Sequence, residues 1–246
     1  MLHLVGDIVG LLDALGAERA VVAGHDWGAP VAWNTALLRP DRVRGVIALS
    51  VPYRPRGSAP PIATLRARFG ERYYPVYVQT PGVADAELAR DVPATFRRWL
   101  YGASGDGPAI ATIVPPGGSL LDLWPEPDAL PGWLTQQDID TFATAFADSG
   151  FTGGLNWYRN LDRNWALTAP WHHAQVRTPA LFIAGERELH FQGGKEAVER
   201  LLAAAPNLRR AVVLPKCGHW VQQERPAEVN AAMIDFLRSL PPMHTD

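Results

Sequence analysis

The sequence predicts an α/β fold in which a parallel sheet, flanked by helices, is interrupted by a long helical insertion. Short apolar runs alternate with helical segments near both ends of the 246-residue chain, and this alternation is typical of parallel sheets. Strand signals are missing between residues 51 and 170, and that stretch is too long for a loop. We therefore expect a discontinuous core, residues 1–50 and 171–246, and an inserted helical lid, residues 51–170.

The first part of the core predicts helix, strand, helix and strand in that order. Residues 1–16 repeat leucine and isoleucine at helical spacing. The apolar run 19–25 indicates a fully buried parallel strand. A helix is expected over 30–38, with Pro30 in its first turn. The next apolar run, 43–50, predicts the neighbouring strand.

The second part of the core resumes the same alternation after the insertion. Strands are expected over 179–186 and 210–216, and helices over 193–205 and 226–240. The insertion between the two parts contains all of the tyrosines and most of the prolines and tryptophans. This composition favours short helical pieces joined by proline and glycine turns.

Composition excludes several classes of protein. Apolar residues make up 47% of the chain, which is ample for a packed core, and a net charge of −2 gives no electrostatic reason to expect a nucleic-acid partner. Cys217 is the single cysteine, so no internal disulfide can form. The apolar N-terminus carries Asp7 and Asp13 and has no basic leader, which fits neither a signal peptide nor a membrane span. We expect a soluble, cytoplasmic protein that does not bind membranes.

The segment Gly24-His25-Asp26-Trp27-Gly28 follows a predicted strand and precedes a predicted helix. It has the form of G-x-S-x-G, a sharp turn that presents a nucleophile above a sheet, with aspartate in place of serine. A carboxylate that attacks a strained sp³ carbon forms an ester, which water can then hydrolyse. The alternative is an aspartate that caps the following helix.

Two further residue types follow the later strands in the order expected of a catalytic triad. Glu186 and Glu188 come directly after one predicted strand, and His219 follows the last one. Ligand sites in such sheets lie at the carboxyl ends of the strands. We expect Asp26 as nucleophile, His219 as the base that activates water and Glu188 as its orienting acid. Glu186 or a lid residue remains an alternative acid, and His219 could instead be a loop histidine bonded to backbone.

Several segments together carry a family resemblance. They are GHDWGAPVAW, YYPVYVQTPGVADAEL, FTGGLNWYRNLDRNW, TPALFIAGERE and CGHWVQQERPAEVN. They resemble the soluble epoxide hydrolases of the α/β-hydrolase superfamily, over about residues 4–240. The resemblance implies an α/β-hydrolase fold and a reaction in which a small apolar epoxide and water give a vicinal diol without cofactor or metal.

By position, the resemblance also implies the roles of two lid tyrosines and of two tryptophans, one of which lies in the nucleophile turn. Tyr74 and Tyr158 match the two lid tyrosines, which would donate hydrogen bonds to the oxygen of the opening epoxide, although Tyr73 and Tyr77 are close neighbours of Tyr74. The backbone N–H of Trp27 would form part of the oxyanion hole. Trp27 and Trp157 are expected to line the substrate pocket.

Two other functions compete with this hypothesis. Haloalkane dehalogenases share the Asp-Trp turn, and a departing halide needs N–H donors but no acid; Tyr158 favours the epoxide. An inactive α/β-hydrolase-like protein that binds apolar ligands is the third possibility. Cys217 is expected to be a packing residue, and the adjacent His172 and His173 point in different directions, so a metal site is not expected.

The sequence departs from the family pattern in two respects. The acid position, usually aspartate, is Glu188. The family has four strands, with an H-G-x-P loop, before the strand that leads into the nucleophile turn, and this sequence contains no H-G-x-P. We therefore expect an N-terminally truncated fold with one oxyanion donor missing and low activity. The strand before Asp26 would then be an edge, through which the chain could self-associate.

Overall fold

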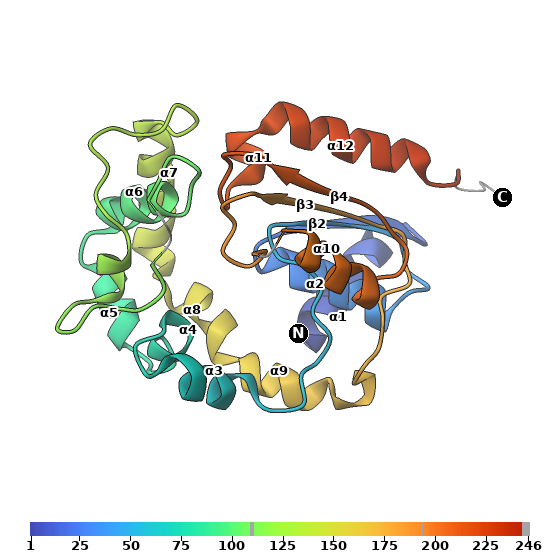
Figure 1. Ribbon diagram of the computed structural model, residues 1–246, viewed down its shortest axis with the longest axis horizontal. Coiled ribbons are helices and arrows are strands. Elements are labelled where there is room, and N and C mark those ends of the chain that lie inside the picture. Colours follow the sequence, from blue (N-terminus) through green and yellow to red (C-terminus); the bar gives the residue numbers. More distant parts are fainter. Residues whose placement is uncertain (109–110, 193, 243–246) are drawn as a thin grey trace. The chain divides into compact units, whose positions relative to one another are not determined.

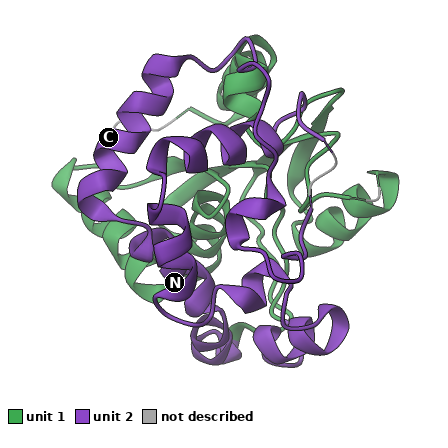
Figure 2. Cartoon of the chain, turned by 90° about the vertical axis from the view of Figure 1, so that its left-hand side faces the viewer, with its two compact units in different colours: residues 1–56, 171–246 green, residues 57–170 purple. Residues whose placement is uncertain are grey.

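The computed structural model describes residues 1–108, 111–192 and 194–242, which form two compact units (Figure 1). Unit 1 combines residues 1–56 and 171–246, and unit 2 comprises residues 57–170 (Figure 2). The first boundary therefore falls six residues after the one expected from the sequence. The expected helix start at Gly193 and the last four residues of the expected core, 243–246, lie outside the described residues.

Unit 1 contains a parallel sheet in the order β1-β2-β3-β4. Its strands are β1 (Ala20–His25), β2 (Val43–Leu49), β3 (Ala180–Gly185) and β4 (Leu208–Leu214). His25 lies opposite Leu49, and Gly185 opposite Leu214. The strands therefore end at one edge of the sheet, as parallel pairing requires, although β2 and β3 are separated in sequence by the whole of unit 2.

Helices cover both faces of this sheet (Figure 1). One face packs against α2 (Gly28–Leu38) and α10 (Gly194–Ala204), and the other against α11 (Val221–Glu224) and α12 (Pro226–Ser239). The first helix, α1 (Leu2–Ala14), packs against α2.

Strand β3 shows how two-sided burial arises. Ala180, Phe182 and Ala184 belong to the core on one face, and Leu181 and Ile183 to the core on the other. Successive side chains of a strand point to opposite faces, so a strand that is covered on both faces must be apolar throughout. All six residues of β3 are buried.

Strand β1 differs from the sequence prediction. It was expected to be fully buried, but its side chains are half-buried and Ala23 is exposed. The reason is its place in the sheet: within the part of the chain that the structure describes, β1 pairs with β2 alone and forms an edge. Self-association through this edge stays a prediction.

Unit 2 is built from short helices. In chain order they are α3 (Pro61–Phe69), α4 (Tyr74–Tyr77), α5 (Val83–Ala89), α6 (Val92–Gly102), the 3-10 turn η1 (Leu120–Leu123), α7 (Gln136–Ser149), α8 (Thr152–Arg159) and α9 (Leu161–Leu167), and a further 3-10 turn, η2 (Ala169–Trp171), leads back to unit 1. The ring of Phe96 on α6 is fully buried and packs against Phe142, Phe146 and Phe151, with centroids 4.9 to 6.0 Å apart. An aromatic cluster thus gives unit 2 a core of its own.

Candidate active site

The turn between β1 and α2 holds Asp26 in a strained backbone conformation. The φ angle of Asp26 is 50°, in the left-handed region that non-glycine residues seldom adopt. A Cβ atom on Gly24 would lie 2.1 Å from the carbonyl oxygen of Gly28, so a larger residue at position 24 would collide with the first turn of α2. A Cβ atom on Gly28 would meet open space. Close packing of strand and helix therefore depends on one glycine of the motif, Gly24.

Three side chains from three strand ends meet beside this turn. The Nε2 atom of His219 lies 3.4 Å from Oδ2 of Asp26, and its Nδ1 atom lies 2.7 Å from Oε2 of Glu188. Asp26 is about one-third exposed, whereas Glu188 is completely buried. The arrangement places an imidazole between an accessible carboxylate and a buried one, which is the geometry of a nucleophile, a base and an orienting acid.

The buried carboxylate of Glu188 is held ionised. Its Oε1 atom accepts the backbone N–H of His190 at 2.8 Å, and its Oε2 atom faces Nδ1 of His219. Burial raises the pKa of Glu188, but the hydrogen bond and the charge of His219 outweigh it and bring the pKa to about 2. Glu186, the alternative acid, is exposed and accepts the backbone N–H of Lys216.

The pKa of the His219 imidazole is raised by the carboxylates on either side of it. Burial lowers the pKa of His219, but the hydrogen bond and charge of Glu188, together with the charge of Asp26, outweigh it and raise the pKa above its ordinary value. Burial and the charge of His219 lower the pKa of the neighbouring His25 to about 4. Near neutral pH, His25 is therefore uncharged and donates from Nε2 to the carbonyl oxygen of His219 at 2.7 Å.

The loop that carries His219 is fixed by hydrogen bonds on both of its sides. The two carboxylate oxygens of Glu224 accept the backbone N–H groups of Gly218 and Trp220, at 2.9 and 3.0 Å. A Cβ atom on Gly185 would lie 2.2 Å from the carbonyl oxygen of Gly218, so the end of β3 and this loop are in close backbone contact. Sequence reasoning missed Glu224 and Gly185 because no motif connects them with His219.

In unit 2, the two tyrosines singled out by the family resemblance lie together. The rings of Tyr74, at the start of α4, and Tyr158, on α8, are 5.6 Å apart and nearly perpendicular. Tyr77, an alternative to Tyr74, donates its hydroxyl hydrogen to Glu87 at 2.5 Å. Burial, reinforced by Glu87, raises the pKa of Tyr77 to about 12. Tyr73 packs between Phe69 and Tyr74.

A half-buried ion pair fixes α8 beside α4 and α5. Arg159, directly after Tyr158, binds both carboxylate oxygens of Asp85 and donates from Nε to the carbonyl oxygen of Val78. Gln79 donates to the carbonyl oxygen of Tyr158 at 3.1 Å. The hydrogen bond from Arg159 opposes the effect of burial and holds the pKa of Asp85 well below its usual range. These contacts position the tyrosine pair, and sequence reasoning did not identify them.

The remaining residues of interest occupy varied environments. Trp27 directly follows Asp26 and is the N-cap of α2, so its N–H belongs to the positive end of a helix. Trp157 is half-buried on α8. Cys217 is buried within the apolar core beneath α12. Among residues 1–108, 111–192 and 194–242, no three His, Cys, Asp or Glu side chains are grouped so as to hold a metal ion.

No helix in the described part of the chain is long and apolar enough to cross a membrane.

The parallel sheet, the helices on both its faces and the carboxylate at the strand-to-helix turn define an enzyme of the α/β-hydrolase class. Residues 2–232 match the Alpha/beta hydrolase family.

Similar proteins of known name identify one family within the α/β-hydrolase class. The chain is 48% identical to epoxide hydrolase A of Mycobacterium tuberculosis, over 97% of this chain and 74% of that protein. It is 41% identical to epoxide hydrolase 3 of Siraitia grosvenorii, over 96% of this chain and 75% of that one. The crystal structure of epoxide hydrolase A from Mycobacterium thermoresistibile superposes with a TM-score of 0.87 at 48% identity, over 97% of this chain and 75% of that one. The chain thus belongs to the epoxide hydrolase family of the α/β-hydrolase superfamily.

Proposed function

We propose that the protein opens a small apolar epoxide and hydrolyses it to a vicinal diol through an ester of Asp26. The observation that carries the proposal is the position of His219 between Asp26 and Glu188, at 3.4 and 2.7 Å. The names of the relatives support the substrate class.

In the first step, a carboxylate oxygen of Asp26 attacks an epoxide carbon. A C–O bond to Asp26 forms as the C–O bond of the ring breaks, and the ring oxygen develops negative charge. Tyr74 and Tyr158 would donate hydrogen bonds to that oxygen, and one of them would transfer its proton. Their rings are in edge-to-face contact in unit 2, which supports a joint role of the two hydroxyl groups.

In the second step, His219 removes a proton from water, and the hydroxide attacks the carbonyl carbon of the Asp26 ester. The backbone N–H of Trp27 would stabilise the oxyanion that forms there. Collapse of this intermediate breaks the ester C–O bond, and the leaving alkoxide takes the proton of the His219 imidazolium to give the diol. The proton of the new carboxyl group returns to the tyrosinate, which restores the Asp26 carboxylate. Glu188 keeps the proton of neutral His219 on Nδ1, which leaves Nε2 free to act as the base, and stabilises the imidazolium that follows.

The test is a single turnover in water enriched in heavy oxygen. The purified chain, in excess over styrene oxide, should form phenylethanediol and incorporate heavy oxygen into the peptide that contains Asp26. Asp26→Asn should abolish turnover, whereas Asp7→Asn, which alters an exposed carboxylate on α1, should leave it unchanged. His219→Gln should accumulate a covalent adduct at Asp26, visible by mass spectrometry.

The tyrosines separate this proposal from dehalogenation. The double variant Tyr74→Phe with Tyr158→Phe should slow ring opening by about 10²-fold or more, the scale of a lost general acid. Diol formation without label in Asp26 would contradict the ester route. Bromide release from 1-bromobutane at a rate above that of diol formation, unaffected by the tyrosine variants, would support a dehalogenase.

A further inference from the structure

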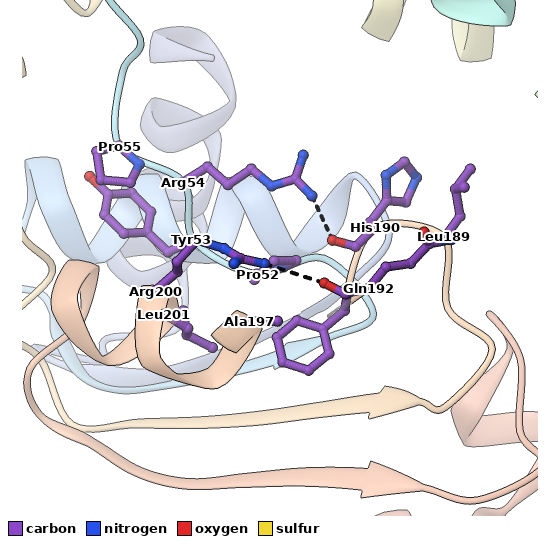
Figure 3. A pocket seen from close by; sticks show the side chains of 11 residues that line it. Pro52, Tyr53, Arg54, Pro55, Leu189, His190, Gln192, Ala197, Arg200 and Leu201 are labelled. Carbon is purple, nitrogen blue, oxygen red and sulfur yellow. Dashed lines mark hydrogen bonds between the residues drawn. The ribbon is translucent and has the colours of Figure 1, made fainter. Parts of the chain in front are cut away.

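Unit 1 contains a cavity that the proposed reaction does not use. It lies between the loop that follows β2, residues 52–55, and the segment of residues 189–192 with the helix α10 (Figure 3). Its volume is about 310 Å³, which is within the range of sites that bind small organic molecules. Every described residue of the lining belongs to unit 1, so the cavity lies within one compact body.

The deep wall of the cavity is apolar. Phe191, Ala197 and Leu201 line it and are buried. Tyr53 lines it as well, but its hydroxyl group donates to the carbonyl oxygen of Ala174 at 2.9 Å. Tyr53 therefore offers mainly its ring to an occupant. An apolar group placed here would be removed from water by contact with these four side chains.

The mouth of the cavity is cationic. Arg54 and Arg200 line it from different segments, and both are exposed to solvent. Arg54 donates to the carbonyl oxygen of His190 at 2.6 Å, and Arg200 donates to that of Gln192 at 3.3 Å (Figure 3). These bonds keep the positive charge of both guanidinium groups at the cavity. The eleven lining residues, all of them described, include no aspartate or glutamate.

We propose that this cavity binds a small organic carboxylate, with its apolar body against Phe191 and Leu201 and its carboxylate at the arginines. A cationic mouth above an apolar wall matches a molecule with one charged end and one apolar end. Arginine suits a carboxylate because its planar fork pairs with two oxygens at once. An inorganic anion has no apolar body to place against this wall, and a neutral molecule would not use the charge of the guanidinium groups.

Calorimetric titration of the chain with phenylacetate tests the proposal, with phenylacetamide as a neutral isostere and inorganic phosphate as an anion without an apolar body. Phenylacetate should bind saturably at one site, and the two other probes at least about tenfold more weakly, since a hydrogen bond to a charged group contributes on that scale. Binding is read without turnover, so the result is independent of the proposed hydrolysis.

Variants locate the binding to this cavity. Arg200→Gln and Arg54→Gln should each weaken phenylacetate binding about tenfold. Ala197→Leu should block it by filling the apolar wall. Lys195→Gln is the matched control, because Lys195 is an exposed cation on the same helix that does not line the cavity. Circular dichroism checks that each variant is folded. Absence of saturable binding, equal binding of phenylacetamide or phosphate, or unchanged affinity in both arginine variants would overturn the proposal.

Discussion

Ser50 donates its hydroxyl hydrogen to the backbone carbonyl oxygen of His219 at 2.7 Å, in a fully buried position. The same carbonyl oxygen accepts a second hydrogen bond from His25, at the end of β1. Ser50 directly follows β2 and has a φ angle of 68°. The ends of two neighbouring strands therefore fix the height of the histidine above the sheet.

Removal of the Ser50 hydroxyl should misplace His219. Ser50→Gly keeps the left-handed backbone accessible while it deletes the hydrogen bond, and loss of a buried partner costs about 1–3 kcal/mol. We expect slower hydrolysis of the Asp26 ester with little change in its formation, measured by pre-steady-state quenching. Ser50→Ala loses the same hydrogen bond but keeps the strain of a side chain at positive φ, which glycine relieves, so its melting temperature should be lower than that of Ser50→Gly. Equal rates for both steps in Ser50→Gly and the unmodified chain would contradict this role.

The two glycines of the nucleophile turn should respond very differently to alanine. Gly24→Ala places a Cβ atom 2.1 Å from the carbonyl oxygen of Gly28. The strand and helix must separate, at a cost of about 3 kcal/mol, and turnover should be lost. Gly28→Ala meets open space and is the control, with near-normal stability in urea unfolding. Similar unfolding midpoints for both variants would refute this account of the turn.

The pH dependence of ester hydrolysis should report His219. The second step needs the neutral imidazole, and the pKa of His219 is raised above 6.5. The rate should therefore fall as the pH decreases through that raised pKa. Glu188→Gln removes the largest of the contributions that raise it, so the falling limb should move to lower pH while the maximal rate drops. Glu186→Gln, which changes an exposed carboxylate, should leave the profile in place.

The ion pair between Asp85 and Arg159 should contribute to stability in a defined pH range. The pKa of Asp85 is lowered in the folded protein, so the contribution is present above the ordinary aspartate pKa of 3.8 and is lost as the pH falls below it. Arg159→Leu leaves the half-buried carboxylate of Asp85 without its cation, although it keeps the hydrogen bonds from Thr152 and Gly82, and should destabilise unit 2 by about 3 kcal/mol at neutral pH. Arg163→Leu, at an exposed position on α9, is the control. Calorimetric unfolding at neutral and acidic pH would show whether the difference between the variants disappears in acid.

The β1 edge should make the chain self-associate at high concentration. An edge strand presents backbone N–H and C=O groups that can pair with a second copy. Light scattering after size exclusion should show a mass that rises with concentration. Ala23→Lys introduces a charge at an exposed position of β1 and should reduce the association. A constant monomer mass over the whole concentration range would exclude pairing through this edge.

Sequence patterns predicted the parts of the fold that depend on local order. The strands at 20–25, 43–49, 180–185 and 208–214 lie where apolar runs had indicated them. The grouping of Asp26, Glu188 and His219 could also be predicted, because parallel strands bring their carboxyl ends to one edge of the sheet wherever they lie in the sequence. The prediction that β1 is fully buried was wrong, since an apolar run indicates a strand but not its neighbours. The departure from the family pattern had indicated an edge strand, and β1 is an edge of the described sheet.

The supporting contacts could not be predicted because they join residues that are distant in sequence and common in type. Ser50 is 169 positions from the histidine that it supports. Asp85 and Arg159 are 74 positions apart, and each resembles an ordinary surface charge in the sequence. Their partners become identifiable only when three-dimensional packing is known.

The split of unit 1 into residues 1–56 and 171–246 also has a consequence for synthesis on the ribosome. Strand β2 leaves the exit tunnel long before its partner β3 exists, and at typical elongation rates the interval is on the order of ten seconds. Unit 2 is contiguous and can fold during that interval. During that interval β1 and β2 cannot pair with β3 and β4, and their apolar side chains lack the second half of the core. The nascent chain therefore depends on the helices α1 and α2, or on a chaperone, to cover them.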